Sequence, residues 1–212
     1  MIAEELTFLY FTDPMCSWCY GFSEAIAAVK ATYPDFGLEV IAGGLRPYTT
    51  DPMPAGYAAE VQKHWHHVEE ASGQTFDYTF FERNPGFIYD TEPSCRALNC
   101  AMRLRPGVGL QFLHRLQTRF YSNGELPTSI DTFVATAKDC KLDGDVFLGA
   151  FREPETLQLT RDGFARAHDL GVSGYPTLLL QINGRPRIIT VGYQSFERIP
   201  AIVDGAIRRY GN

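Results

Sequence analysis

The sequence predicts an α/β fold in which a large, all-helical insertion separates the two halves of one sheet. A strand–helix–strand unit opens the chain, and a strand–strand–helix unit closes it. The long region between them shows helical patterns and little strand character. A length of 212 residues suits one domain with a large insertion, and a hydrophobic content of 45% is enough for a proper core.

The first unit is read from apolar runs and their breakers. Residues 6–11 predict a buried strand rich in aromatic side chains, which ends at Asp13-Pro14. Apolar residues at helical spacing predict a helix from Trp18 to about Thr32. Residues 38–42 predict a second strand, and the two strands should be parallel with a right-handed crossover.

The middle region begins with a connector rich in Pro, Gly and Thr over residues 46–56. Gly, Pro and Asn then punctuate a series of helical patterns, as breakers between helices do. Helices are predicted at residues 58–72, 93–104, 109–122, 130–140 and 144–151. We therefore expect residues 49–152 to form a helical insertion domain.

The closing unit follows a helix predicted at residues 155–170. Residues 177–182 and 187–191 read as antiparallel strands, because Asn183-Gly184 between them is a strong two-residue hairpin signal. A last helix is predicted over residues 195–209. One face of that helix carries the apolar residues Ile199, Ile202, Val203 and Ile207.

Without the helical middle, the element order is β-α-β followed by α-β-β-α. That order is the order of the thioredoxin fold, which we expect residues 1–48 and 153–212 to form.

Two cysteines, Cys16 and Cys19, lie where the first strand passes into the first helix. A helix N-terminus favours negative charge, and a cysteine there can have its pKa lowered from about 8.5 to roughly 3.5–7.5. This arrangement suits thiol–disulfide exchange, in which one thiolate attacks and its neighbour resolves the mixed disulfide. The alternative, half of a zinc site, lacks a second cysteine pair or a suitably spaced histidine, so we expect no metal.

Composition argues against several other classes of protein. The net charge is −6 and the charges are scattered, which indicates neither a nucleic-acid partner nor a membrane surface. No apolar stretch approaches the roughly 18 residues of a membrane-spanning helix. Residues 1–5 are acidic and lack the pattern of a signal peptide, so a cytoplasmic location is expected. In that reducing compartment the other three of the five cysteines should be free thiols.

The chain resembles a known family. The segment Asp13-Pro14-Met15-Cys16-Ser17-Trp18-Cys19-Tyr20-Gly21-Phe22, the long helical insertion, and Gly174-Tyr175-Pro176-Thr177 before a strand are similar to the DsbA-like thiol oxidoreductases. The resemblance is to the cytosolic branch that includes FrnE-type proteins and predicted protein-disulfide isomerases. It covers essentially the whole chain.

The resemblance implies roles for particular residues. Cys16 would be the nucleophile and Cys19 the resolving thiol, and Pro176 would form a cis peptide bond and lie against the pair. Tyr175 would present its backbone groups to a bound peptide. The expected substrates are polypeptides or low-molecular-weight thiols and disulfides, with glutathione a candidate co-substrate and no other cofactor.

The chain departs from the usual pattern at two places. Thioredoxin-type proteins usually carry a buried acid six residues before the first cysteine, where this chain has Tyr10. The residues between the cysteines are Ser17 and Trp18, with no histidine to stabilise a thiolate by charge. Ser17 and Trp18 are nevertheless expected to contact substrate. Oxidation, reduction and isomerisation stay open as activities.

Three further features each have more than one reading. The run His64-Trp65-His66-His67 is a solvated helix face or, alternatively, a metal cluster or part of a substrate groove. Tyr20, Phe22 and Trp18 form an apolar rim around the cysteine pair, or Phe22 belongs to the core. Cys95 falls in the first turn of a helix, where the pKa of a thiol can be lowered. It is either a buried structural thiol or an accessory thiol near the active site. Of the remaining cysteines, Cys100 is expected in the core and Cys140 at a helix end.

Two alternative functions remain. The first is a glutathione-dependent, kappa-type isomerase or transferase, such as a 2-hydroxychromene-2-carboxylate isomerase, although a serine normally replaces the first cysteine in those enzymes. The second is a redox-inactive chaperone that binds polypeptides.

Overall fold

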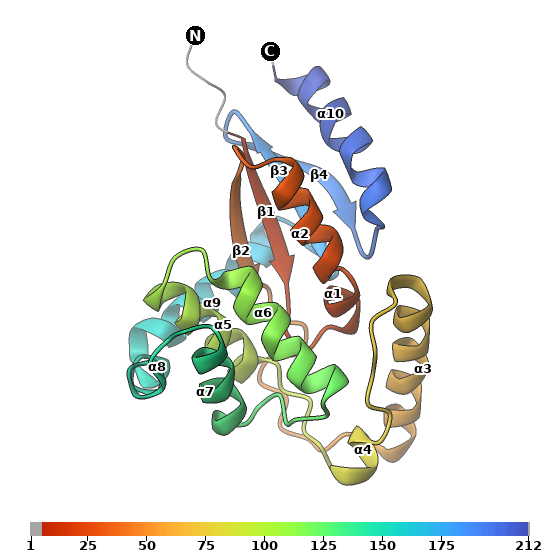
Figure 1. Cartoon of the computed structure of the whole chain (residues 1–212), viewed down its shortest axis with the longest axis vertical. Helices are drawn as coiled ribbons and strands as arrows, with labels where there is room; N and C mark the ends of the chain where they lie inside the picture. The colour runs from red at the N-terminus through yellow and green to blue at the C-terminus, as the bar shows by residue number, and fades with distance from the viewer. Residues whose placement is uncertain (1–5, 212) are drawn as a thin grey trace.

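The computed structural model describes residues 6–211 and contains a mixed sheet in the strand order β2-β1-β3-β4 (Figure 1). The strands are β1 (Thr7–Thr12), β2 (Gly37–Ala42), β3 (Thr177–Ile182) and β4 (Arg185–Val191). β1 pairs parallel with β2 and antiparallel with β3, and β3 pairs antiparallel with β4. This topology confirms the predicted thioredoxin fold. The acidic segment 1–5, from which a cytoplasmic location was expected, lies outside the described residues.

Side chains of β1 alternate between the two faces of the sheet, as the pleat of a strand requires. Phe8 and Tyr10 point into the main core, on the face covered by helix α2 (Ser23–Thr32). Leu9 and Phe11 point to the opposite face and pack near Ala167 of helix α9 (Pro154–Asp169). The central strand is therefore buried on both sides, which explains its nearly continuous apolar sequence.

The single helix predicted from Trp18 to Thr32 is two helices, α1 (Ser17–Gly21) and α2, that meet at Phe22. Phe22 is fully buried, and its ring lies 5.8 Å from that of Tyr10. Gly21 lets α1 approach the insertion closely, because a Cβ there would lie 2.8 Å from Val68 Cγ1. Tertiary packing on both sides therefore turns the chain between the two helices.

The predicted insertion is helical throughout, with irregular connections. It comprises α3 (Ala55–Ser72), α4 (Phe80–Arg83), α5 (Glu92–Leu104), α6 (Gly109–Gln117), the π-helical segment η1 (Thr118–Ser122), α7 (Ile130–Asp139) and α8 (Gly144–Arg152). The short helix α4 is not predicted by the sequence pattern. The helix predicted at 109–122 changes from α to π geometry at Thr118, and such π turns are frequent at functional sites.

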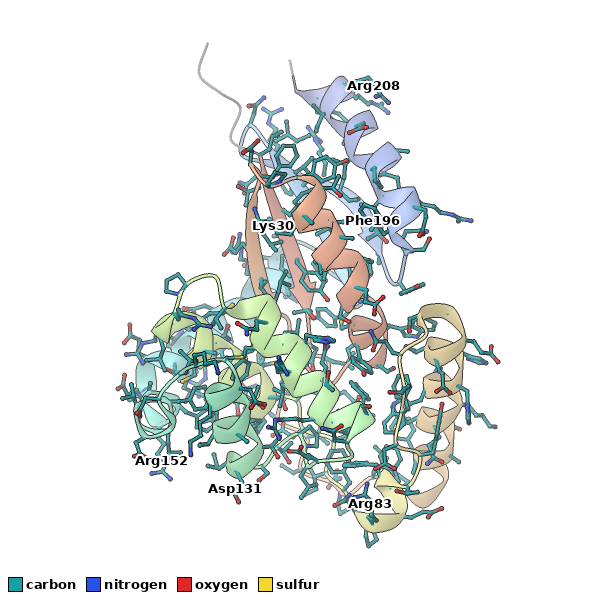
Figure 2. All side chains as sticks on the ribbon, viewed as in Figure 1. Lys30, Arg83, Asp131, Arg152, Phe196 and Arg208 are labelled. Atoms are coloured by element: carbon teal, nitrogen blue, oxygen red, sulfur yellow. The ribbon has the colours of Figure 1, made fainter. Side chains whose placement is uncertain are left out.

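The end of the chain follows the predicted hairpin. Asn183 and Gly184 both have positive φ, at 52° and 73°, as the favoured two-residue turn requires. A 3-10 turn, η2 (Phe196–Arg198), leads into α10 (Ile199–Tyr210). Ile199 and Val203 are fully buried, but Ile202 is 39% exposed, so the expected apolar face is narrower than predicted. Figure 2 shows Phe196 at the start of α10, on the side that faces α2.

A second cluster of buried side chains, made largely of aromatic rings, lies in the insertion beside α1. We call it the aromatic cluster, and its fully buried centre is Trp65 of α3. The other buried members are Met15, Tyr20, Val61, Val68, Phe76, Phe80, Phe87, Tyr89, Phe120 and Tyr121. Charged side chains such as Arg83, Asp131 and Arg152 lie at the periphery of the insertion (Figure 2). Within residues 6–211, no helix has the length and apolar character needed to cross a membrane.

Candidate active site

The two cysteines of the motif meet at the first turn of α1. Cys16 is the N-cap residue of this helix, and its Sγ accepts a hydrogen bond from the Cys19 backbone N–H at 3.4 Å. The Cys16 carbonyl accepts from the backbone N–H groups of both Cys19 and Tyr20. Both cysteines are free thiols, so the structure represents the dithiol form. The helix thus directs a backbone donor at the first sulfur of the pair.

The two thiols differ in burial. Cys19 is completely buried, and Cys16 is 5% exposed. Cys16 is only slightly exposed because it lies against the loop that carries Tyr175. Burial raises the pKa of the Cys19 thiol well above its ordinary value, and the neighbouring Cys16 raises it further. Cys16 is therefore the less buried residue of the pair.

The Tyr175–Pro176 peptide bond is cis, and the loop that contains it lies against the cysteine pair. The Cys16 thiol donates a hydrogen bond to the Tyr175 carbonyl at 3.5 Å, across 159 positions of sequence. The Pro176 carbonyl accepts from the Gly192 backbone N–H at 2.7 Å, which ties the loop to the end of β4. The structure therefore brings together Cys16, Cys19, Tyr175 and Pro176, as the resemblance implied.

The side chain of Tyr175 is fixed by the segment that follows β2. Its hydroxyl donates to the Gly43 carbonyl at 2.7 Å, and a Cβ at position 43 would lie only 2.2 Å from the ring. Residue 43 must therefore be glycine for the ring to occupy this place. The sequence led us to expect contacts from the Tyr175 backbone alone, whereas its side chain also anchors the loop.

Asp13 is a buried acid beside the motif that the sequence pattern did not single out. Its Oδ1 accepts from the Met15 backbone N–H at 2.8 Å, and its Oδ2 accepts from the Leu45 backbone N–H at 2.6 Å. Its carbonyl accepts from the Cys16 backbone N–H at 3.1 Å. Burial raises the pKa of the Asp13 carboxyl, although the two backbone donors partly oppose this. Asp13 thus joins the cysteine loop to the segment after β2.

Cys95 lies beside this carboxylate. Its thiol donates to Asp13 Oδ2 at 3.4 Å from the first turn of α5, and the residue is fully buried. Burial raises the pKa of Cys95 well above its ordinary value, and the neighbouring Asp13 charge adds to the effect. Of the two readings of Cys95, burial favours the structural thiol, because desolvation has a larger effect on its pKa than the helix end.

The two remaining cysteines are also buried. Cys100 is in the main core, and burial raises its pKa to about 12. Cys140 is the C-cap of α7, as expected, and burial raises its pKa.

Two tyrosines of the insertion reach the cysteine loop without having been predicted. The Tyr89 hydroxyl donates to the Met15 carbonyl, and Tyr121 of η1 stacks on Tyr20 with ring centroids 5.1 Å apart. Burial raises the pKa of both hydroxyls, so both stay protonated at neutral pH. Aromatic residues scattered through an insertion give no spacing signal, which is why the sequence did not reveal them.

Of the three aromatic residues considered for an apolar rim around the cysteine pair, only one is partly exposed. Phe22 and Tyr20 are both buried, the first in the main core and the second in the aromatic cluster. Trp18 and Ser17 are partly exposed. The Trp18 ring lies 5.6 Å from that of Tyr193, whose hydroxyl donates to the Ala71 carbonyl at 2.8 Å. Trp18 is therefore the aromatic side chain of the motif that remains partly exposed.

The histidine-rich run of α3 divides into two environments. His64, His66 and His67 are exposed, as expected for a solvated face, whereas Trp65 is 1% exposed in the aromatic cluster. His66 stacks on Tyr78, with centroids 4.2 Å apart. In the part of the chain that the structure describes, no three His, Cys, Asp or Glu side chains are placed to hold a metal ion.

The sequence profile of the DSBA-like thioredoxin domain matches residues 7–203, nearly the whole chain. The chain belongs to this family. A crystal structure of a candidate protein disulfide isomerase from Nitrosomonas europaea is 32% identical, with a TM-score of 0.90, and the match covers 98% of this chain and 100% of that one. A search of curated protein sequences found no match.

More distant structures share the fold. The cytosolic disulfide reductase DsbM from Pseudomonas aeruginosa is 24% identical, with a TM-score of 0.77 over 96% of this chain and 99% of that one. DsbM has also been crystallised with GSH. A 2-hydroxychromene-2-carboxylate isomerase is 10% identical, with a TM-score of 0.63 over 96% of this chain and 95% of that one. The expected fold and family, including the DsbA-type cysteine pair, are therefore confirmed.

Proposed function

We propose that this DsbA-like protein catalyses dithiol–disulfide exchange, with Cys16 as the nucleophile and Cys19 as the resolving thiol. The contact set of Cys16 carries the proposal. Its Sγ lies 3.4 Å from the Cys19 backbone N–H and 3.5 Å from the Tyr175 carbonyl, and it is the less buried of the two thiols. A sulfur that accepts a hydrogen bond from the helix and borders the cis-proline loop is suited to attack a substrate disulfide bound beside that loop.

The exchange proceeds in two steps. The Cys16 thiolate attacks a substrate disulfide R–S–S–R′, which forms a Cys16–S–S–R bond and releases R′–S⁻. Cys19, as a thiolate, then attacks Cys16 Sγ, which releases R–S⁻ and leaves a Cys16–Cys19 disulfide. Two electrons pass to the substrate, and the two protons lost by the dithiol are taken up by the released thiolates. The oxidative reaction is the reverse sequence.

Backbone groups of the cis-proline loop would hold a substrate in the extended form. Tyr175 is anchored through its ring and hydroxyl, so its backbone is fixed beside Cys16. An extended peptide can add to such an edge by main-chain hydrogen bonds. Trp18 and Ser17 would contact the substrate from the other side of the sulfur, because both remain partly exposed.

A small thiol would return the protein to its dithiol form. Glutathione is our candidate, and the structure of DsbM with GSH supports it because DsbM has the same fold. The description of DsbM as a cytosolic disulfide reductase supports reduction in the cytoplasm as the direction of the reaction. The presence of both thiols argues against a kappa-type isomerase, which needs no second cysteine.

A reductase assay tests this function. The purified protein is given insulin or a glutathionylated peptide together with reduced glutathione, and substrate reduction is followed over time. We expect turnover by the parent and none by Cys16→Ser. Cys140→Ser is the matched control, since Cys140 ends a helix of the insertion, and it should turn over like the parent. Equal rates for the parent and Cys16→Ser would overturn the proposal, and insulin reduction at the parent's rate by Cys19→Ser would show that glutathione, and not Cys19, resolves the mixed disulfide.

A further inference from the structure

Two buried hydroxyls lie under the resolving thiol. Tyr10 and Thr12 are two residues apart on β1, so their side chains point to the same face of the sheet. That face is the one on which α1 and α2 pack, as the contact between the Tyr10 and Phe22 rings shows. Tyr10, Thr12 and Cys19 are all fully buried there.

Neither hydroxyl makes a regular hydrogen bond in the part of the folded chain that the structure describes. Among the described residues, Tyr10 Oη and Thr12 Oγ1 are buried atoms without a hydrogen-bond partner. Leaving a buried polar group without a partner is unfavourable, and most buried polar groups in native proteins are paired. The Cys19 thiol lies within side-chain reach of both hydroxyls, and all three residues are completely buried. Two unpaired hydroxyl donors beside a reacting thiol suggest that their acceptor forms only during the reaction.

We propose, on the basis of the exchange function above, that Thr12 and Tyr10 donate hydrogen bonds to the Cys19 thiolate while it resolves the mixed disulfide. A neutral thiol is a weak acceptor, whereas a thiolate is a strong one, so these bonds form only in the state that reacts. They replace the buried carboxylate that thioredoxin-type proteins usually carry at the position of Tyr10.

The surrounding charges explain the need for such donors. The titratable groups that face Cys19 from the packed elements are Cys16, Tyr10, Asp13, Tyr121 and Tyr175. All of these are acids, so none supplies a positive charge to a thiolate. Thr12 and the Asp13 backbone N–H are the neighbours that lower the pKa of Cys19 against the effect of burial. Burial keeps Tyr10 protonated, so it acts as a donor and not as a base.

Formation of the mixed disulfide also makes ionisation of the Cys19 thiol easier. Once Cys16 is bonded to substrate it carries no negative charge, so its opposition to ionisation of Cys19 disappears. The thiolate then forms against burial alone, and the hydroxyls lie on the side of β1 where they can stabilise it. The proton of Cys19 passes to the released substrate thiolate, and no other reactant is needed.

The test separates the two steps with an aromatic disulfide, dithiobis(nitrobenzoate), whose released thiolate absorbs visible light. Attack by Cys16 gives a first phase that depends on reagent concentration. Resolution by Cys19 releases the second coloured thiolate in a phase independent of concentration. The rate of the second phase is measured from about pH 6 to about pH 10 for the parent, Thr12→Val, Thr12→Ser and Tyr10→Phe.

We expect Thr12→Val and Tyr10→Phe to move the midpoint of the second phase upward by about one pH unit. Because a more basic thiolate is also more nucleophilic, the rate should fall roughly threefold below the midpoint and rise roughly threefold above it. The first phase should keep its rate, and Thr12→Ser, which retains a hydroxyl, should follow the parent. A buried threonine of α7 provides the control, Thr132→Val, which should leave both phases unchanged.

Two results would overturn the inference. An unchanged pH midpoint of the second phase in both Thr12→Val and Tyr10→Phe would show that the hydroxyls do not bind the Cys19 thiolate. A slowing by the same factor at every pH would show a structural role only. Should one variant fail to fold, the other decides. Absence of any Cys19-dependent second phase in the parent would instead contradict the exchange function itself.

Discussion

The ring of Tyr175 occupies the space that a side chain at position 43 would need, and its hydroxyl donates to the Gly43 carbonyl at 2.7 Å. The Tyr175 carbonyl accepts a hydrogen bond from the Cys16 thiol. The segment after β2 therefore sets the position of the cis-proline loop, and the loop in turn borders the nucleophile.

Gly43→Ala should consequently slow exchange. The added Cβ would lie 2.2 Å from the Tyr175 ring, so the ring and its loop must move away from Cys16. Displacements of about 1 Å at a reacting centre can cost roughly a hundredfold in rate. We expect a fall of about tenfold to a hundredfold in the rate of insulin reduction. Gly56→Ala, on an exposed turn of α3 where a Cβ meets nothing, should match the parent; equal activity of both variants would contradict the role of Gly43.

Asp13 gives a prediction about stability and pH. An acid whose pKa is raised by folding stabilises the protein fully below its unfolded pKa, near pH 4, and loses that contribution as the pH rises through the folded value. Asp13→Asn removes this dependence and one acceptor for the Met15 or Leu45 N–H, at a cost of about 1–3 kcal/mol. Urea unfolding at several pH values should show a larger deficit of the variant in acid than at neutral pH. A deficit that grows with pH would contradict the assigned pKa direction.

Cys95 should not react in the native protein. Its thiol is fully buried, its pKa is raised by burial, and it donates to Asp13. Brief alkylation of the reduced protein, followed by mass spectrometry, should label Cys16 well before Cys95, and unfolding in urea should make both reactive. Labelling of Cys95 as fast as Cys16 would instead support the accessory-thiol role.

Trp65 should be the most sensitive position of the insertion. Its ring lies within 5.5 Å of the rings of Phe76, Phe81 and Tyr121, measured between centroids. Replacing a buried Trp by Ala costs about 3–5 kcal/mol, because it leaves a cavity. Trp65→Ala should therefore lower the unfolding free energy by that amount, while the neighbouring exposed His67→Ala should change it by less than about 0.5 kcal/mol. A small effect of Trp65→Ala would mean that the aromatic cluster is not a cooperative core.

The strands and the cysteine pair were predictable because local patterns specify them. The run before Asp13 is apolar at successive positions, and the Asn183-Gly184 turn requires two positive φ values that these residues adopt readily. The break at Phe22 and the exposure of Ile202 were not predictable, since each depends on a neighbouring helix or strand distant in sequence.

The site was predicted in part for the same reason. Cys16, Cys19 and Pro176 carry a recognisable spacing, whereas Asp13 was read only as the end of a strand. Its role depends on Leu45 and Cys95, which approach it only in the folded chain. The position of Cys95 in the first turn of a helix was predictable, but the desolvation that raises its pKa cannot be read from a helix pattern.

The most direct test of the central claim is to trap the mixed disulfide. Cys19→Ser removes the resolving thiolate and keeps nearly the same shape, so an adduct on Cys16 should persist. The variant is incubated with oxidised glutathione or a disulfide-bonded peptide, and the modified residue is mapped by mass spectrometry. We predict an adduct on Cys16 in Cys19→Ser that disappears on reduction and is absent from Cys16→Ser. An equal adduct in Cys16→Ser, or none in Cys19→Ser, would contradict the assignment of attack and resolution.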